Sequence, residues 1–223
     1  MLARRHRGED VVGGFFLFDG AHPLEGDVVN LDRLFAWGLR FAGLTHFFDT
    51  VLGGSLLGVS GEVLTDFGKA VVRRANERGV IIDIAHSSPA MVEDVLDLTT
   101  APVMLSHGGV KGACDTPRNL PDALMQRIVA SGGVVGIGYW DAAICDASPD
   151  GIVKSIRYAV DLLGVDHVAL GSDYDGATTV PFDTSELAIL TGTMLRTGFS
   201  EEEIRKVMGE NAKRFLLENL PDA

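Results

Sequence analysis

The stretch VIIDIAHSSPAMVEDVLDLTTAPVMLSH, which runs from Val80 to His107, contains the same short pattern twice. An apolar run rich in Val and Ile ends on His86, a segment with helical spacing follows, and a second apolar run ends on His107. Nearly continuous apolar runs are typical of strands buried on both faces of a parallel sheet, and parallel strands need a crossover between them. The stretch therefore predicts a strand–helix–strand unit in which each strand ends on an imidazole.

The same unit recurs along the chain. Short runs rich in Val, Ile and Phe predict strands at residues 11–18, 40–45, 80–85, 102–106, 133–139 and 167–172. Segments with the spacing of amphipathic helices lie between these runs, and some open on a capping residue such as Ser88. Regular alternation without a linker predicts a single α/β domain over residues 1–223. It is either an open, doubly wound sheet or a (β/α)8 TIM barrel.

The polar residues that end the strands favour the barrel. A doubly wound nucleotide-binding sheet would carry a GxGxxG turn after an early strand, and no such turn follows any predicted strand. A barrel instead collects its functional groups at the carboxyl ends of several different strands. Five of the predicted strands end on such groups, namely Asp19, His46, His86, His107 and Asp173.

These residue types predict a metal site at that end of the barrel. If the strands before His86 and His107 are neighbours, their imidazoles meet and need a metal ion or an acidic partner, and Asp19 could supply the carboxylate. Arg118, in the loop after His107, is either a solvated charge or a clamp for a substrate carboxylate. Asp173 either caps a turn or takes part in the chemistry.

Composition limits the class of protein. The 223-residue chain is 46% hydrophobic, enough for a sizeable core, and its formal net charge is −12. Its basic residues form no sustained stripe, which argues against nucleic acid or a membrane as partner. No apolar stretch is long enough for a signal peptide or a membrane span. Cys114 and Cys145 cannot form a disulfide framework, so a reducing compartment is the simpler interpretation and we expect a soluble cytoplasmic protein.

Several segments resemble one known family. The segments IDIAHSS, LSHGGVKGACDTPRNLP, GVVGIGYW and DHVALGSDYDG, in this order and spacing, are similar to the membrane (renal) dipeptidase family of zinc peptidases within the amidohydrolase superfamily. The likeness extends over nearly all of the chain from Gly14 onward. It implies a TIM barrel that holds two zinc ions at its carboxyl rim and hydrolyses dipeptides.

The resemblance also implies which residues bind metal. His86 and His107 match the two histidine ligands of one zinc ion, and Asp19 stands where the family has a glutamate that bridges both ions. Aspartate is one methylene shorter, and carboxylate–zinc bonds stay near ~2.0–2.2 Å, so Asp19 could still ligate one ion but would bridge two with difficulty. The family's His-x-Asp motif, which supplies ligands of the other zinc, is not found in this sequence. We therefore expect zinc as the cofactor, with either two ions or one.

The remaining strand-end residues match positions that contact substrate in the family. On this basis His46 would stabilise the developing oxyanion and Arg118 would bind the free carboxylate of the dipeptide. Asp173 would transfer a proton between the attacking water and the leaving amine, or hold the substrate ammonium group. His46 and Asp173 are thus expected to be catalytic as well as substrate-binding.

The comparison with the family also predicts an incomplete barrel. The His-x-Asp motif ends the first strand in the family, and by this comparison the chain lacks the first two of eight strands. We expect either a sequence truncated at its N-terminal side or an open sheet whose gap something covers. Unpaired strand edges favour self-association, so we keep a homodimer open.

The sequence thus predicts a zinc-dependent dipeptidase that uses a metal-activated water. One alternative is a catalytically impaired relative that binds metal or substrate without turnover, because of the missing motif and the aspartate at position 19. A weaker alternative keeps the barrel and the metal but changes the substrate to another amide or a lactam, which fold alone does not decide.

Overall fold

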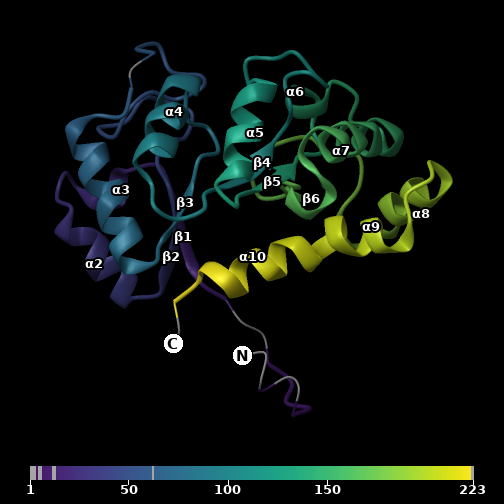
Figure 1. Cartoon of the computed structure of the whole chain (residues 1–223), viewed down its shortest axis with the longest axis horizontal. Coiled ribbons are helices and arrows are strands. Elements are labelled where there is room, and N and C mark those ends of the chain that lie inside the picture. The colour runs from purple at the N-terminus through teal and green to yellow at the C-terminus, as the bar shows by residue number, and fades with distance from the viewer. Residues whose placement is uncertain (1–3, 5–6, 12–13, 62, 222–223) are drawn as a thin grey trace.

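A six-stranded parallel sheet forms the centre of the protein (Figure 1). The computed structural model describes residues 4, 7–11, 14–61 and 63–221. Its strands are β1 (Phe16–Asp19), β2 (Leu39–Gly43), β3 (Ile81–Asp83), β4 (Met104–Gly108), β5 (Val134–Ile137) and β6 (Val168–Leu170). Consecutive strands are neighbours, each pair is parallel, and β1 and β6 lie at the two edges of a sheet that is not closed.

This arrangement confirms the predicted barrel-type α/β fold with six strands. Each predicted strand is present, although the structure shortens most of them, and residues 12–13 of the first predicted run lie outside the described residues. The order β1 to β6 is that of a wound barrel, because every connection moves to the adjacent position in the same direction.

Helices connect the strands as the spacing predicts. The main crossovers are α2 (Val29–Ala36), α3 (Asp66–Arg78), α4 (Pro89–Leu98), α5 (Asp122–Ala130) and α7 (Pro149–Leu163). Three of them begin at hydroxyl N-caps that accept a backbone N–H, namely Thr65, Ser88 and Ser148. None of the helices in the described residues combines the length and apolarity that crossing a bilayer requires.

Additional helical segments follow the last strand or fill the loops. The short ones are η1 (His22–Leu24), α6 (Asp141–Ile144), η2 (Val165–His167) and η3 (Thr184–Glu186). The C-terminal ones are α8 (Ala188–Arg196), α9 (Glu201–Arg205), the π-helical η4 (Lys206–Glu210) and α10 (Asn211–Asn219).

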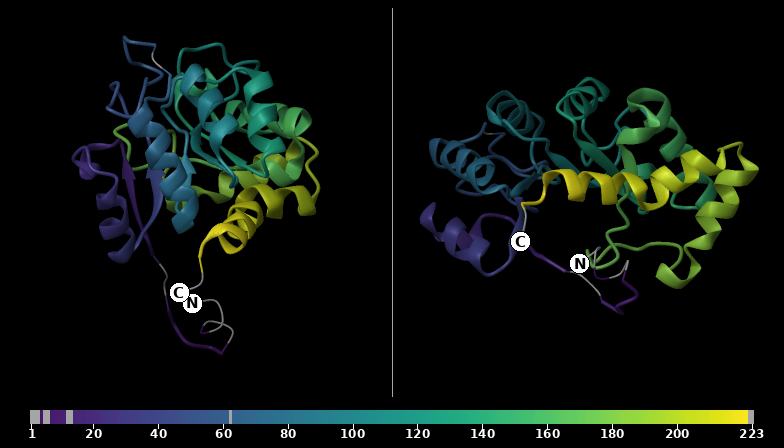
Figure 2. Two further views of the ribbon diagram at one scale, coloured as in Figure 1. Left: turned by 60° about the vertical axis from the view of Figure 1, so that its left-hand side comes forward. Right: turned by 60° about the horizontal axis from the view of Figure 1, so that its bottom comes forward.

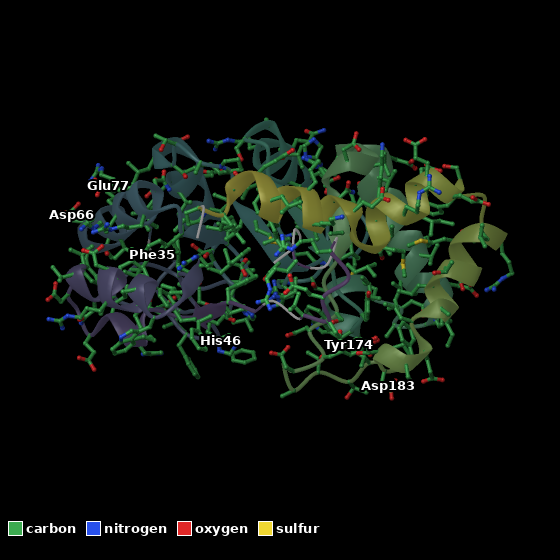
Figure 3. All side chains as sticks on the ribbon, turned by 90° about the horizontal axis from the view of Figure 1, so that it is seen from below. Phe35, His46, Asp66, Glu77, Tyr174 and Asp183 are labelled. Atoms are coloured by element: carbon green, nitrogen blue, oxygen red, sulfur yellow. A yellow bond between two sulfur atoms is a disulfide. The ribbon has the colours of Figure 1, made fainter. Side chains whose placement is uncertain are left out.

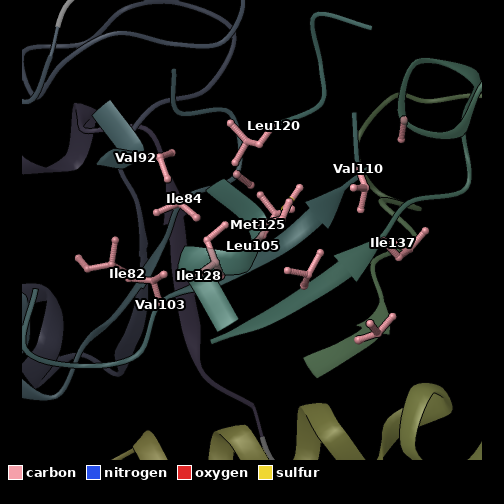
Figure 4. Packing of buried hydrophobic residues seen from close by; sticks show 14 of the residues in the cluster. Ile82, Ile84, Val92, Val103, Leu105, Val110, Leu120, Met125, Ile128 and Ile137 are labelled. Carbon is pink, nitrogen blue, oxygen red and sulfur yellow. The ribbon is translucent and has the colours of Figure 1, made fainter. Parts of the chain in front are cut away.

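The main core lies between the sheet and the helices that cover its outer face. Ile82, Leu105 and Val135 point outward from neighbouring strands and are buried against helix residues such as Val92 and Ile128. Figure 4 shows this layer, with the side chains of α4 and α5 packed over β3 and β4. Because strand side chains alternate between faces, the residues on either side of these point inward.

The inner face carries a smaller core that α10 closes. Phe41, Ile81, Val134 and Ala169 pack against Phe215 of α10. Figures 1 and 2 show α10 crossing the sheet at the end where the strands begin. The opposite end, where the strands finish, is the end at which the functional groups of a barrel are expected.

Two glycines bring β4, β5 and β6 close together near the carboxyl rim. A Cβ on Gly136 would lie 2.1 Å from the carbonyl oxygen of Ser106, and one on Gly171 would lie 2.5 Å from the same oxygen. Neither distance is compatible with a side chain, so residues without a Cβ are required at both positions.

A disulfide between Cys114 and Cys145 corrects the expectation of two unpaired cysteines. Cys114 lies in the loop after β4, and Cys145 follows α6 in the segment after β5. Loops that follow neighbouring parallel strands meet at one rim, so two cysteines 31 positions apart come together. The sequence contains no CxxC motif that would have indicated this pairing. Asn119 joins the same segments, since its Nδ2 donates to the carbonyl oxygens of Cys114 and Ala143 at 2.8 Å each. The cytoplasmic location stays a prediction, and the two cysteines no longer support it because they are joined to each other.

Replacing both cysteines by serine is expected to lower the free energy of unfolding by about 3–4 kcal/mol, because the bond closes a loop with a sequence separation of 31. Urea denaturation of the wild type and of the double variant C114S/C145S measures the difference. Dithiothreitol should reproduce the loss in the wild type and leave the double variant unchanged. Two titratable thiols in denatured, non-reduced wild-type protein would contradict the disulfide.

Candidate metal centre

A cavity of about 880 Å³ opens where the strands end. Groups from the ends of different strands line it, among them Asp19, His46, His86, His107, Arg118 and Asp173. Phe41, Met104 and Leu216 line its apolar part, the last of them from α10. Figure 3 shows His46, which follows β2, and Tyr174, which follows β6, on the same edge of the molecule. The structure therefore brings every residue predicted for the site into one cavity.

His86 and His107 form the centre of the site. Their Nε2 atoms lie 2.8 Å apart, and the two rings pack edge to face. His86 follows β3 with a φ of 65°, a backbone conformation that few residues other than glycine adopt. The Nδ1 atom of His107 is within 2.8 Å of the Ser106 hydroxyl, which fixes the orientation of that ring. The predicted convergence of the two strand ends is present.

Asp19 and His46 complete a group around His86. The carboxylate Oδ2 of Asp19 lies 3.7 Å from Nε2 of His46 and 3.8 Å from Nε2 of His86. Ligand atoms of these three residues all lie within 4.8 Å of one another. His46, which the sequence places among the substrate contacts, is thus close enough to Asp19 and His86 to serve as a ligand as well.

Burial determines the protonation of this group. Burial, followed by the nearby Arg118, His107 and His46, lowers the pKa of His86 to about 2. Burial also lowers the pKa of His107. For Asp19, burial followed by the charge of Asp83 raises the pKa to about 7. Both imidazoles are therefore neutral at physiological pH, which is the form that binds a metal ion.

Arg118 presents an unused donor to the cavity. Its side chain is only 7% exposed, and its Nη2 donates to the carbonyl oxygen of His107 at 2.8 Å. Its Nη1 is buried and has no hydrogen-bond partner among the described residues. The guanidinium also lies 5.5 Å from the ring centre of Trp140. A buried cation with a free donor is suited to an anionic group, because leaving that donor unpaired is costly.

Asp173 lines the same cavity as Arg118 and His107. Its φ of 58° is again in the left-handed region. Burial raises its pKa, while the nearby charges of His107 and Arg118 oppose that rise. Unusual backbone geometry and a raised carboxyl pKa together are typical of residues held for a function.

Asp83 and Trp140 are two residues of the cavity wall that were not predicted from the sequence. Asp83 is the last residue of β3, and Trp140 follows β5, the one strand for which no strand-end group was predicted. A signal for Asp83 was present, since a charge inside the apolar run VIIDIA must face either a partner or a cavity. Trp140 gave no comparable signal, because an apolar residue after a strand is ordinary.

The donor set fits zinc. Two imidazole nitrogens that each lie about 2.0–2.1 Å from one zinc ion are within about 4.2 Å of each other, and the pair observed here at 2.8 Å satisfies this limit. The Nδ1 atom of His86 has no hydrogen-bond partner among the described residues, so the polar contact of that ring is the one that its Nε2 makes with His107. Neutral imidazoles with a nearby carboxylate are a typical ligand set of catalytic zinc.

Comparisons with known proteins identify relatives of this chain. A curated relative, an uncharacterized dipeptidase of Schizosaccharomyces pombe, is 31% identical over 206 residues, which are 88% of this chain and 50% of the relative. The chain thus spans about half the length of that relative.

Two solved structures have the same fold. A dipeptidase described as a metallopeptidase of family M19 superposes with a TM-score of 0.88 at 27% identity, over 98% of this chain and 67% of that one. A metallopeptidase of Rhodobacter sphaeroides, bound to a phosphinate mimic of the dipeptide L-Ala-D-Ala, also gives 0.88 at 27% identity, over 98% and 66%. The family model described as membrane dipeptidase, peptidase family M19, matches residues 3–219, and the chain therefore belongs to this family of metallopeptidases.

Proposed function

We propose that this chain provides the active site of a zinc-dependent dipeptidase. The observation that carries the proposal is the pair of neutral imidazoles 2.8 Å apart, beside a buried arginine that keeps one donor free. The first feature suits a metal ion, and the second suits the free carboxylate that distinguishes a dipeptide from an internal peptide bond. The relative that binds a phosphinate mimic of L-Ala-D-Ala supports a dipeptide as the substrate.

We propose one zinc ion, whose ligands we predict to be His86, His107 and Asp19. Asp19 lies 3.8 Å from Nε2 of His86, and the group of ligand atoms within 4.8 Å of one another contains His46 rather than His107. Three protein ligands are usual for catalytic zinc, which keeps a fourth position for water or substrate. When bound, the ion supplies Lewis acidity and lowers the pKa of water to about 7. Asp19 would bind the ion as an ionised carboxylate, because a nearby positive charge favours the charged form of a carboxyl group.

The other groups bind and orient the dipeptide. The free Nη1 of Arg118 donates to the substrate carboxylate, while Nη2 keeps its bond to the carbonyl oxygen of His107. His46 stabilises the oxyanion that develops on the scissile carbonyl. Asp173, whose pKa is raised by burial, accepts the proton of the attacking water and passes it to the leaving amine.

Replacing either His86 or His107 by alanine should reduce dipeptide hydrolysis at least 100-fold and weaken zinc binding, because each removes a ligand. Activity against a panel of dipeptides and metal content by plasma emission spectroscopy measure the two effects. H167A is a matched control, since His167 bonds to the carbonyl oxygen of Gly133 at the other end of the sheet. Unchanged hydrolysis in the two site variants would refute the metal centre. A measured content of two zinc ions per wild-type chain would refute the single ion.

Replacing Arg118 by methionine should lower kcat/KM for dipeptides about 10- to 150-fold, mostly through KM. This range corresponds to a charged hydrogen bond of about 1.5–3 kcal/mol. The matched substrate is the same dipeptide with a C-terminal amide. Wild type should discriminate against the amide by a similar factor, and R118M should lose that discrimination. Equal discrimination by both proteins would assign carboxylate recognition to another residue.

A further inference from the structure

Asp83 is a buried carboxylate whose role the proposed chemistry does not require. It ends β3, is only 9% exposed and lies in the wall of the cavity. It belongs to neither the metal ligands nor the substrate contacts proposed above. A charged side chain buried in a strand persists only where its bonds compensate for the lost hydration, so those bonds indicate its purpose.

One oxygen of Asp83 holds the chain at two points. Its Oδ1 accepts hydrogen bonds from the backbone N–H of Ala85 at 3.0 Å and of Ser106 at 3.1 Å. Ala85 directly precedes His86, and Ser106 directly precedes His107. The same oxygen thus fixes the residue before each of the two imidazoles.

Backbone pairing between β3 and β4 does little to fix the separation of His86 and His107. β3 and β4 are paired in register at one position, where Asp83 lies opposite Met104, and the N–H of Ile84 donates to the carbonyl oxygen of Met104 at 2.9 Å. Beyond that point the N–H of Ser106 donates to the Asp83 side chain instead of a strand carbonyl. The carboxylate therefore replaces the backbone ladder at the end where the strands lead into the histidines.

We propose that Asp83 is a positioning residue that holds His86 and His107 at the separation needed to share one metal ion. This inference rests on the proposed metal centre and deepens it. The relevant property is the place of the oxygen acceptor rather than the charge of the group, because both bonds go to uncharged backbone N–H groups. Partners that orient metal ligands in this way typically change metal affinity 10- to 100-fold when removed.

Three substitutions of Asp83 distinguish the effect of the position of its oxygen acceptor from the effect of its charge. D83N keeps an oxygen in place and removes the charge, D83E keeps the charge and displaces the oxygen by one methylene, and D83A removes both. We expect zinc affinity, measured by titration calorimetry, to stay within about threefold of wild type in D83N. It should fall about 10- to 100-fold in D83E and D83A. The control is D94A, which removes an aspartate that accepts the N–H of Leu64 away from the histidines and should leave zinc affinity unchanged.

Crystal structures of the metal-free variants give a second readout that does not depend on zinc. The distance between Nε2 of His86 and Nε2 of His107 should remain near 2.8 Å in D83N and increase in D83E. D83N that binds zinc as weakly as D83E, or D83E that binds as wild type, would overturn the proposal. If D83A does not fold, the other two variants carry the test. If wild-type protein binds no zinc, the proposed metal centre fails, and the nitrogen–nitrogen distance still tests the role of Asp83.

Discussion

Two buried imidazole nitrogens 2.8 Å apart cannot both carry a proton toward each other. A proton added to the pair would lie close to Arg118 and away from water, and burial together with Arg118 and the neighbouring histidines lowers the pKa of His86 to about 2. At most one of the two facing nitrogens carries a proton, so the pair presents at least one lone pair to the space between the rings. Every other feature of the rim, from the placement of β3 beside β4 to the free donor of Arg118, is arranged around that pair.

The charges around the pair have few partners of their own. Asp19, Asp173 and Arg118 share one cavity, and burial raises the pKa of both carboxyl groups while it lowers that of the guanidinium. Such an arrangement costs stability, which the extensive outer core between sheet and helices can support. Ligands that bring opposite charge relieve the cost, which is consistent with the metal ion and the dipeptide carboxylate that we propose for this site.

Much of this could be predicted from the sequence, because periodicity and strand-end residues report local chemistry. The runs before His86 and His107 predicted two adjacent strands, and the structure places them as neighbours. Contacts between loops could not be predicted in the same way. Cys114 meets Cys145 only because the segments after β4 and β5 lie side by side. The run VIIDIA marks Asp83 as a buried charge, but its partners are backbone N–H groups that no residue type identifies, so its role could not be predicted.

The glycines beside Ser106 have a consequence for the shape of the sheet. A methyl group at Gly136 or Gly171 would act as a wedge against the carbonyl oxygen of Ser106 and push β5 and β6 away from β4. Because neither residue has a Cβ, the backbones of the three strands can approach one another closely at their carboxyl ends. The close approach of β5 and β6 to β4 at the rim is thus set by atoms that two residues do not have.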